Sequence, residues 1–360
     1  MLPQAGRPLA PFSTIGVGGR ARWFARAEST GDVAAAHRWC REHGLPLFVL
    51  GGGSNIVIAD EGVEGLVLQV ALGGITESRL DGDTLVRASA GEPWDQVAAL
   101  AVSRGLAGVE CLSGIPGCVG GTPIQNVGAY GQEVADTIHT VEVFDTVSGE
   151  MDALTAAECG FEYRMSRFKR VDAGRFVVCG VTFRLRPGPP AVMYPDLVRY
   201  LEAEAISNPT VRDVRSAVLA IRRRKGMVID AADPDTRSVG SFFMNPIVPV
   251  EVYSRLSAEE QSGIVPGFVL ETGDVKIPAA WLIERSGFSK GYGDGPVGLS
   301  SKHPLAIINR GGATAGDVVD MALRIKRRVV EECDVWLRPE PVFVGFGDAA
   351  DVQYLQKAHA

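Results

Sequence analysis

One serine in this sequence has neighbours that suit either a structural or a chemical role. Ser241 lies between Gly240 and two phenylalanines in SVGSFFMNP, which covers residues 238–246. A hydroxyl held against large apolar side chains is shielded from water and can be kept ready for chemistry. The alternative is a buried serine whose hydroxyl is satisfied inside a core. The residues around Ser241 leave both interpretations open.

Two glycine-rich stretches have the composition of loops that bind a ligand through the backbone. LGGGSN, residues 50–55, places three glycines between two apolar strands. Glycines let backbone N–H groups converge on one point, as in anion-binding nests, although a tight hairpin turn is the alternative. SGIPGCVGGTPIQNVGAYGQE, residues 113–133, is long enough to be either functional or disordered, and its apolar residues argue against disorder. Together the two stretches favour a dinucleotide-sized cofactor.

A cationic run, RRRK at residues 222–225, closes a segment with helical apolar spacing. Positive side chains are favourable at the C-terminus of a helix, which explains much of the run. Arg222 lies one helical turn before Lys225, so the two side chains share a face.

The predicted secondary structure that positions these residues differs between regions of the chain. Before residue 70, apolar spacing predicts a helix over 31–44 and strands at 45–50, 56–60 and 65–70, typical of a small α+β subdomain. From residue 71 the pattern is strand-rich. It predicts strands at 84–91, 137–150 and 175–188, and a helix at 93–105 with Pro93 in its first turn.

Helices return after a proline-rich stretch at 186–193, which we interpret as a domain boundary. Two later segments have helical spacing and begin with a threonine followed three residues on by an aspartate, the pattern of a capping box. These segments are 208–226, with Thr210 and Asp213, and 314–333, with Thr314 and Asp317. The chain closes with a strand-like stretch at 334–346.

Several familiar patterns do not fit their required context. GVGGRA, from Gly16, matches a loose dinucleotide fingerprint, but a strand-like RARWFARA follows it in place of a helix. GFSKG, around Ser289, follows a helical segment, whereas a nucleophile elbow needs a strand, a turn and a helix. The five histidines are dispersed and the six cysteines form no Cys-x-x-Cys pair, so we expect free thiols and no metal site.

Charge and hydropathy limit the partners. A formal net charge of −7 argues against a general nucleic-acid binder. No apolar run approaches the ~18 to 20 residues that span a bilayer, and the first residues lack the pattern of a signal peptide. We expect a cytoplasmic, monomeric protein with neither nucleic acid nor membrane as a partner.

Six motifs, taken in order, resemble one family. They are LGGGSN, IPGCVGGTPIQNVGAYG, EYRMSRF, VGSFFMNP, SSKHPLAIIN and LRPEP. Their combination is similar to the UDP-N-acetylenolpyruvoylglucosamine reductase family, and the resemblance covers residues 10–346. It implies an α+β fold: a two-lobed FAD-binding domain of the UDP-N-acetylmuramate dehydrogenase and vanillyl-alcohol-oxidase-like type, plus an α+β substrate-binding domain. The expected parts are a first FAD lobe at 1–70, a second at 71–190 rejoined by 331–360, and a substrate-binding domain at 191–330.

The resemblance also implies an activity. NADPH would reduce FAD, and the flavin hydride would reduce UDP-N-acetylglucosamine enolpyruvate to UDP-N-acetylmuramate in peptidoglycan precursor synthesis. Ser241 would donate the proton, and Arg164 would bind the substrate carboxylate with its planar fork. Glu340 would work with Arg164 to stabilise the enolate-like intermediate. The structural alternatives for Arg164 and Glu340 are a surface salt bridge and a strand-edge carboxylate.

The resemblance names binding residues as well. Those expected to bind FAD are Gly51, Gly52, Gly53, Ser54, Asn55, Gly117, Gly121, Thr122, Asn126, Gly128 and Tyr130. Those expected to bind the substrate are Tyr194, Arg222, Lys225, Asn245 and His303. For Tyr194 and His303, partly buried packing is a comparable alternative, and the better-known subtype of the family has glutamine in place of His303.

Two other functions remain to be separated from this one. A flavin oxidase of the same fold, acting on a sugar or alcohol, would reduce oxygen and ignore NADPH. A non-catalytic relative would bind the UDP-sugar without a flavin. The presence of Ser241, Arg164 and Glu340 together argues against both.

Overall fold

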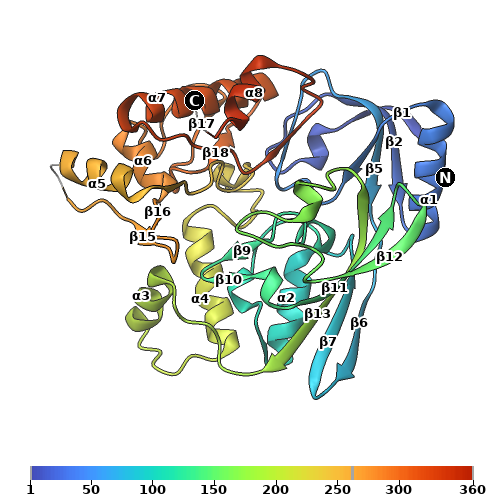
Figure 1. Cartoon of the computed structure of the whole chain (residues 1–360), viewed down its shortest axis with the longest axis horizontal. Helices are drawn as coiled ribbons and strands as arrows, with labels where there is room; N and C mark the ends of the chain where they lie inside the picture. Colours follow the sequence, from blue (N-terminus) through green and yellow to red (C-terminus); the bar gives the residue numbers. More distant parts are fainter. Residues whose placement is uncertain (1, 261–262, 359–360) are drawn as a thin grey trace. The chain divides into compact units, whose positions relative to one another are not determined.

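The computed structural model describes residues 2–260 and 263–358, which form two compact units (Figure 1). The first unit contains Ala21–Gly53, Val63–Val228 and the N-terminal residues up to Arg7. The second contains Pro8–Arg20, Ser54–Gly62 and the chain from Ile229 onward. Each unit is therefore assembled from segments that are distant in the sequence.

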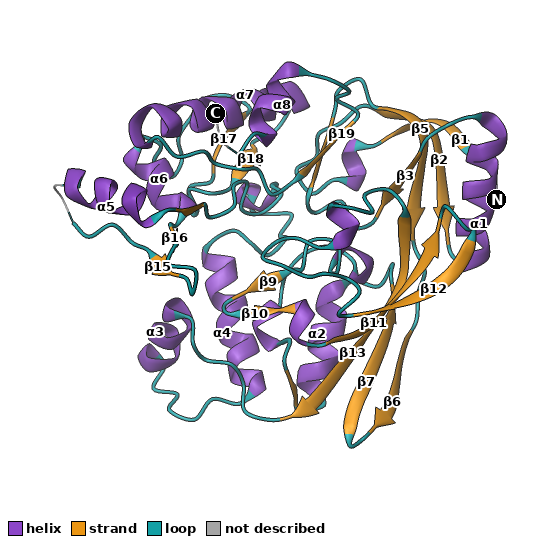
Figure 2. Cartoon of the chain, in the orientation of Figure 1, coloured by secondary structure: helices purple, strands orange, loops and turns teal. Residues whose placement is uncertain are grey.

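The first unit combines a sheet with parallel strands, an antiparallel sheet and several helices (Figure 2). Its helices are α1 (Thr30–His43), α2 (Trp94–Ser103), α3 (Pro195–Ala203) and α4 (Val211–Arg224), with 3-10 turns η2 (Glu110–Leu112), η3 (Val119–Gly121), η4 (Val134–Asp136) and η5 (Arg167–Lys169). Its strands are β1 (Gln4–Pro8), β2 (Arg20–Ala27), β3 (Leu47–Leu50), β5 (Val63–Val70), β6 (Ile75–Leu80), β7 (Asp83–Ser89), β8 (Leu106–Ala107), β9 (Gly128–Ala129), β10 (Gln132–Glu133), β11 (Ile138–Asp145), β12 (Glu150–Thr155) and β13 (Phe176–Pro187).

The two large sheets of this unit differ in strand direction. The first has the order β1-β2-β5-β3, and β5 runs parallel to both β2 and β3. The second has the order β12-β11-β13-β7-β6, and these neighbours are antiparallel. A unit with both arrangements and separate helices is α+β, which confirms the predicted class.

Local sequence explains where the helices of this unit begin and end. In α1, Ser29 caps the N-terminus and Asp32 bonds back in a capping box, while Gly44 ends the helix in the left-handed conformation. The predicted capping box of α4 is confirmed, because Thr210 accepts from the Asp213 N–H and Asp213 bonds back to Thr210. Each such cap contributes about 1 kcal/mol.

Helix α2 is fixed to the antiparallel sheet by its first residue. Trp94 is 1% exposed and meets the ring of Phe183 in β13 edge-on at 5.4 Å. Its indole Nε1–H donates to the Leu112 carbonyl at 2.8 Å, directly before the long glycine-rich loop. Truncating such a buried tryptophan typically costs about 3–5 kcal/mol, so Trp94 couples the start of that loop to the core.

In its described residues, the second unit contains a long helix, α7, and three small sheets. Its helices are α5 (Val250–Glu259), α6 (Ala279–Arg285), α7 (Ala315–Cys333) and α8 (Ala350–Gln356), with 3-10 turns η1 (Ala10–Phe12) and η6 (Pro234–Thr236). Its strands are β4 (Ile56–Ile58), β14 (Ile247–Val248), β15 (Phe268–Val269), β16 (Val275–Lys276), β17 (Val297–Leu299), β18 (Ile307–Asn309) and β19 (Val342–Val344). The sheets are β14-β16-β15, β17-β18 and β19-β4.

Helix α7 begins as predicted and is capped twice. Thr314 and Asp317 form the expected capping box, and the carboxylate of Asp60 accepts from the N–H groups of Ala315 and Gly316 at 2.8 and 3.0 Å. Because Asp60 lies just beyond the end of β4, the short early segment of this unit is tied to its main helix.

The rejected motifs have the contexts that the sequence predicted. The GVGGRA stretch leads into strand β2, and the GFSKG stretch follows α6 in a segment without helix or strand.

All six cysteines are free thiols, five of them buried and Cys118 half-buried. The stretch 186–193, expected as a boundary, covers the end of β13 and part of its connection to α3, and it lies inside the first compact unit. The three-part division by ligand remains a prediction.

Candidate active site

The two glycine-rich loops contact each other in the first unit. A Cβ on Gly52 would lie 2.7 Å from the Cα of Gly117 and 3.0 Å from the Cys118 nitrogen, so only glycine permits this approach. The loop between β3 and β4 is not a hairpin, because β3 pairs with β5 and β4 pairs with β19. The sheet topology thus excludes the tight-hairpin alternative for LGGGSN.

Other glycines of the same loops face open space. A Cβ on Gly51 or on Gly121 would meet no other atom within 4 Å. A pair of touching loops, each with a bare backbone face, is the kind of cradle that a flat dinucleotide can enter through main-chain contacts. The residues of these loops therefore fit the FAD that the sequence implies.

Most polar side chains of the long loop are used to shape the loop itself. Thr122 Oγ1 donates to the Val119 carbonyl at 2.8 Å. Asn126, in the left-handed conformation, donates to Glu133 Oε2 at 2.6 Å and to the Glu162 carbonyl at 3.1 Å, and accepts from the Ala135 N–H. Asn126 thus joins the loop to the segment that carries Arg164.

Arg164 extends from a tight turn onto the end of the same loop. It has φ +56°, and its Nη2 donates to the Gly128 carbonyl at 2.7 Å. A Cβ on Gly128 would lie 3.3 Å from Arg164 Nη1 and 2.9 Å from the Gln132 carbonyl. The absence of a Cβ at Gly128 thus leaves room for the guanidinium beside the backbone, and Arg164 is half-buried there.

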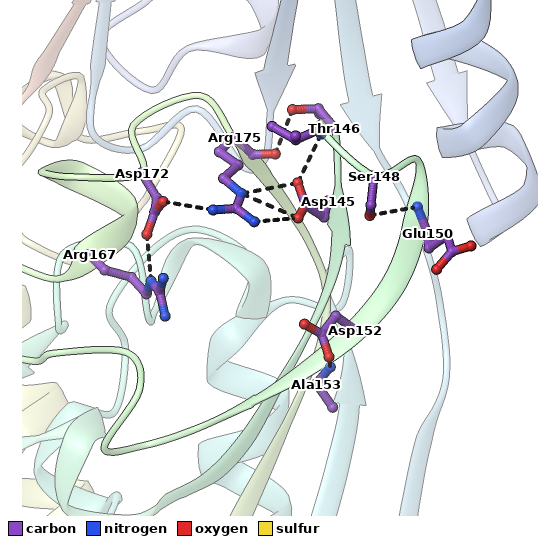
Figure 3. Close-up of polar contacts among 10 residues, drawn as sticks. Asp145, Thr146, Ser148, Glu150, Asp152, Ala153, Arg167, Asp172 and Arg175 are labelled. Atoms are coloured by element: carbon purple, nitrogen blue, oxygen red, sulfur yellow. Dashed lines mark hydrogen bonds and ion pairs between the residues drawn. The ribbon is translucent and has the colours of Figure 1, made fainter.

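Ion pairs anchor the segment from which Arg164 extends (Figure 3). The guanidinium of Arg175 donates hydrogen bonds to both carboxylate oxygens of Asp145, and the distance from Nη2 to Oδ2 is 2.7 Å. Arg175 also donates to Asp172. Arg167 Nε donates to the other oxygen of Asp172 at 2.6 Å. Hydrogen bonds from Arg175 hold the pKa of Asp145 down at about 2. The pairs fix the part of this stretch that leads into β13 and tie it to β11.

Arg222 is a second cation beside Arg164. Its Nη2 donates to the Met227 carbonyl at 2.8 Å, but its buried Nε has no hydrogen-bond partner among the described residues. Burial lowers the pKa of Arg222, and the neighbouring charge of Arg164 lowers it further. Interactions with Tyr130 and Asp95 raise this pKa but do not outweigh the burial. Two positively charged guanidinium groups that are close together and shielded from water repel each other, so a bound anion stabilises them.

Lys225 and Tyr194 lie in the same unit as Arg222. Lys225 Nζ binds Asp196 Oδ2 at 2.6 Å, and Asp196 also binds Arg199. Burial alone would raise the pKa of Asp196, but Lys225 and Arg199 outweigh it and lower the pKa. Tyr194 meets the ring of Tyr130 edge-on at 5.3 Å, so one predicted substrate residue touches one predicted cofactor residue.

Sequence reasoning missed Asp95, which ties the loop to helix α4. Its carboxylate accepts two hydrogen bonds from Arg215, at 2.7 and 2.8 Å, and one from the Gly114 N–H at 2.6 Å. One side chain in the first turn of α2 thereby positions both the start of the 113–133 loop and the helix that carries Arg222. The only signal in the sequence was an acidic residue at a helix start, which is common.

Ser241 lies in a short backbone ladder of the second unit. The N–H of Phe242 donates to the Leu305 carbonyl, and the carbonyl of Phe242 accepts from the Glu340 N–H, both at 2.8 Å. Phe242 and Phe243 are 0% and 1% exposed, whereas Ser241 is half-buried. No hydrogen bond of the Ser241 hydroxyl occurs among the residues that the structure describes, and both interpretations of Ser241 stay open.

Glu340 is held on its other side by the first glycine motif. Asn55 Nδ2 donates to the Glu340 carbonyl at 3.3 Å, and the Asn55 carbonyl accepts from the Val342 N–H at 3.0 Å. From there β4 and β19 run parallel, with Ile56 opposite Val342. Asn55 of LGGGSN and the motifs VGSFFMNP and LRPEP, far apart in the sequence, thus form one local structure in the second unit.

Asn245 and His303 have backbone partners in the second unit. The Asn245 side-chain carbonyl accepts from the Ala279 N–H at 2.9 Å and so caps helix α6. The Nδ1 of His303 accepts from the Leu305 N–H at 3.2 Å. Contact of either residue with a substrate remains a prediction.

The predicted site residues fall into two sets. The first unit brings together Arg164, Arg222, Lys225, Tyr130, Tyr194 and the glycine loops, and the second brings together Ser241, Glu340, Asn55, Asn245 and His303. The catalytic group of Ser241, Glu340 and Arg164 therefore draws on both units and stays a prediction. None of the helices in the described ranges combines the length and the apolar character that a membrane crossing needs.

Comparisons with known proteins match two parts of the chain to family models. A family model for an FAD binding domain matches residues 21–154, and one for the C-terminal domain of UDP-N-acetylenolpyruvoylglucosamine reductase matches residues 233–344. The crystal structure of the UDP-N-acetylenolpyruvylglucosamine reductase from Thermus caldophilus covers 95% of this chain, and 100% of that chain is matched, with a TM-score of 0.64 and 26% identity.

Curated relatives are closer in sequence. The UDP-N-acetylenolpyruvoylglucosamine reductase of Thermobifida fusca is 48% identical over 351 residues, which are 94% of this chain and 97% of that protein. The corresponding protein of Salinispora arenicola is 46% identical over 350 residues, which are 95% of this chain and 96% of that protein. This chain belongs to the UDP-N-acetylenolpyruvoylglucosamine reductase family and contains an FAD-binding domain.

Proposed function

We propose that this chain reduces UDP-N-acetylglucosamine enolpyruvate to UDP-N-acetylmuramate for peptidoglycan precursor synthesis, as a cytoplasmic monomer. FAD, when bound, supplies hydride transfer from NADPH to the enol carbon. The observation that carries the proposal is the ladder in which Phe242 bonds to Glu340, because it places the Ser241 and Glu340 segments side by side.

The chain's own residues would divide the remaining work. Arg164 would grip the substrate carboxylate, where negative charge develops as the double bond is reduced. Ser241 would give its hydroxyl proton to the carbon next to that carboxylate. Glu340 would help to stabilise the enolate-like species, and the phenylalanines after Ser241 would keep water from competing.

The cations of helix α4 would bind the anionic end of the substrate. Arg222 and Lys225 are one turn apart, and the buried Nε of Arg222 is available to an acceptor. Lys225 would exchange its contact with Asp196 for one with the diphosphate. Tyr194, against Tyr130, would pack over the uridine portion.

One rapid-mixing experiment separates this function from its rivals. The FAD-loaded protein is mixed with NADPH under anaerobic conditions, and the reduced flavin is then mixed with the enolpyruvyl nucleotide or with oxygen. The proposal expects bleaching by NADPH and fast reoxidation by the nucleotide. Fast reoxidation by oxygen without a response to NADPH would favour the oxidase, and failure to bind flavin would favour the non-catalytic relative.

A further inference from the structure

The loop that carries His303 is built around a buried serine. Ser300 is 0% exposed, and its Oγ accepts from the N–H groups of Lys302 and His303 at 3.0 and 3.3 Å. Buried Asp235 accepts from both the N–H and the hydroxyl of Ser301. The backbone of residues 300–303 is therefore fixed before the imidazole is considered.

The imidazole itself completes the turn. His303 Nδ1 accepts the Leu305 N–H at 3.2 Å, and the His303 carbonyl accepts the Ala306 N–H at 3.2 Å. A ring nitrogen that accepts a hydrogen bond carries no proton, so the neutral ring has its proton on Nε2. The side chain thus orients the Leu305 peptide with one specific nitrogen.

The Leu305 peptide continues directly to Ser241. Its carbonyl accepts the Phe242 N–H at 2.8 Å, and Phe242 is fully buried, so that N–H has no access to water as a substitute partner. The position of the Ser241 backbone therefore depends on where the turn at His303 places one carbonyl oxygen.

We propose that His303 is a positioning residue for Ser241, acting through Nδ1, Leu305 and the Phe242 N–H. This inference rests on the proposed function, in which Ser241 donates the proton. It differs from the role implied by family resemblance, in which His303 would contact the substrate. It makes Nδ1, not Nε2, the nitrogen that matters for the proton-transfer step.

Two amide substitutions separate the nitrogens. The Oδ1 of Asn occupies the place of Nδ1 and can accept from Leu305, whereas the amide of Gln reaches the place of Nε2. We expect His303→Asn to keep the limiting rate of flavin reoxidation by the enolpyruvyl nucleotide within about threefold of the parent, and His303→Gln to slow it about 10²-fold through misplacement of Ser241. The apparent dissociation constant of the nucleotide should change little in either variant.

A second readout does not depend on the reaction. Hydrogen–deuterium exchange of the peptide covering residues 239–244, measured on FAD-loaded protein, should be about tenfold faster in His303→Gln than in the parent and unchanged in His303→Asn. His43→Gln, at an exposed histidine of α1, is the matched control and should resemble the parent in both measurements.

The outcomes are distinct. If His303→Gln matches the parent in both readouts and His303→Asn does not, or if His303→Asn is impaired as much as His303→Gln, the positioning role is wrong. If Ser241→Ala reoxidises like the parent, the proposed proton donor is wrong, whereas the exchange pattern still reports separately whether His303 holds the Ser241 segment.

Discussion

Arg164 illustrates how much of this site depends on single residues in unusual backbone conformations. It has a positive φ, as do Asn126 and Tyr130 of the loop beside it. Non-glycine residues in that region cost on the order of 1–3 kcal/mol each and persist only where surrounding contacts determine them. Here the contacts are the Asn126 hydrogen bonds and the bond from Arg164 to Gly128. Such strain gathers at functional sites, which agrees with the proposed role of Arg164.

The first prediction concerns the guanidinium of Arg164. Arg164→Lys keeps the charge but loses the planar fork, so the limiting rate of reoxidation by the enolpyruvyl nucleotide should fall about 10²-fold. Stopped-flow absorbance measures this rate, and flavin reduction by NADPH should keep its parent rate. Arg22→Lys, at an exposed ion pair with Glu64, is the control. Full activity of Arg164→Lys would leave Arg164 with a structural role only.

The second prediction separates two kinds of glycine in the loops. Gly52→Ala forces a Cβ against the backbone of Gly117, so the melting temperature without FAD should fall by about 2–6 °C. Gly121→Ala meets only open space, so the same melting temperature should not change. Its FAD dissociation constant should rise about tenfold if the cofactor occupies that space. Unchanged FAD affinity in Gly121→Ala would place the cofactor elsewhere.

Motif spacing identified most of these residues, but their partners could not be read from the sequence. Ser241 had two open interpretations because its surroundings come from Leu305 and Glu340, which are distant along the chain. Asp95 was missed because its acceptor atoms serve Arg215 and Gly114 through tertiary contacts. Short-range patterns carry no information about such pairings.

For helices and strands too, the sequence predicted local features but not contacts between distant segments. The capping boxes of α4 and α7 were predictable, because four adjacent residues determine each one. The parallel pairing of β4 with β19 was not, since a three-residue strand has no pattern that selects a remote partner. Yet this pairing brings Asn55 to Glu340 and so builds part of the candidate site.

The third prediction concerns the ion pairs that anchor the segment of Arg164. The pKa of Asp145 is held at about 2 by Arg175, below the ~3.9 of an unfolded chain. A lowered carboxyl pKa gives stability that is present above ~4 and is lost as the pH falls toward 2. Asp145→Asn should therefore unfold at lower urea than the parent at pH 7, and the difference should shrink below pH 4.

The control for this prediction lies on the neighbouring strand. Asp152 is exposed, and within the described part of the chain its carboxylate accepts a hydrogen bond from the adjacent Ala153 N–H alone (Figure 3). Asp152→Asn should shift the urea midpoint little at any pH. An Asp145→Asn difference that stays constant from pH 7 to pH 3 would show that the Arg175 pair does not contribute through charge.

The described chain forms two compact units, and each unit consists of several segments that are separated in the sequence. Composition predicted a chain long enough for more than one domain, and local patterns predicted most elements. The crossing points near residues 7, 20, 53, 62 and 228 were not predictable, because they reflect which segments pack together. The second unit needs its early segments: β4 pairs with β19, and Asp60 caps α7.

The fourth prediction follows from that dependence. A fragment of residues 229–360 lacks β4 and Asp60, so it should not unfold cooperatively in urea. Circular dichroism should show reduced helix content, because α7 loses the cap of Asp60 and part of its packing. Adding residues 8–20 and 54–62 as linked segments should restore a cooperative transition. Native-like cooperativity of the bare fragment would contradict the account of this unit.

The central claim is that the Ser241 hydroxyl donates the proton that completes substrate reduction. The most direct test is anaerobic stopped-flow with Ser241→Ala, using Ser289→Ala at an exposed serine as the control. NADPH should bleach the flavin of both variants at the parent rate, but only Ser289→Ala should be reoxidised rapidly by the enolpyruvyl nucleotide. Reoxidation of Ser241→Ala at the parent rate would contradict the claim.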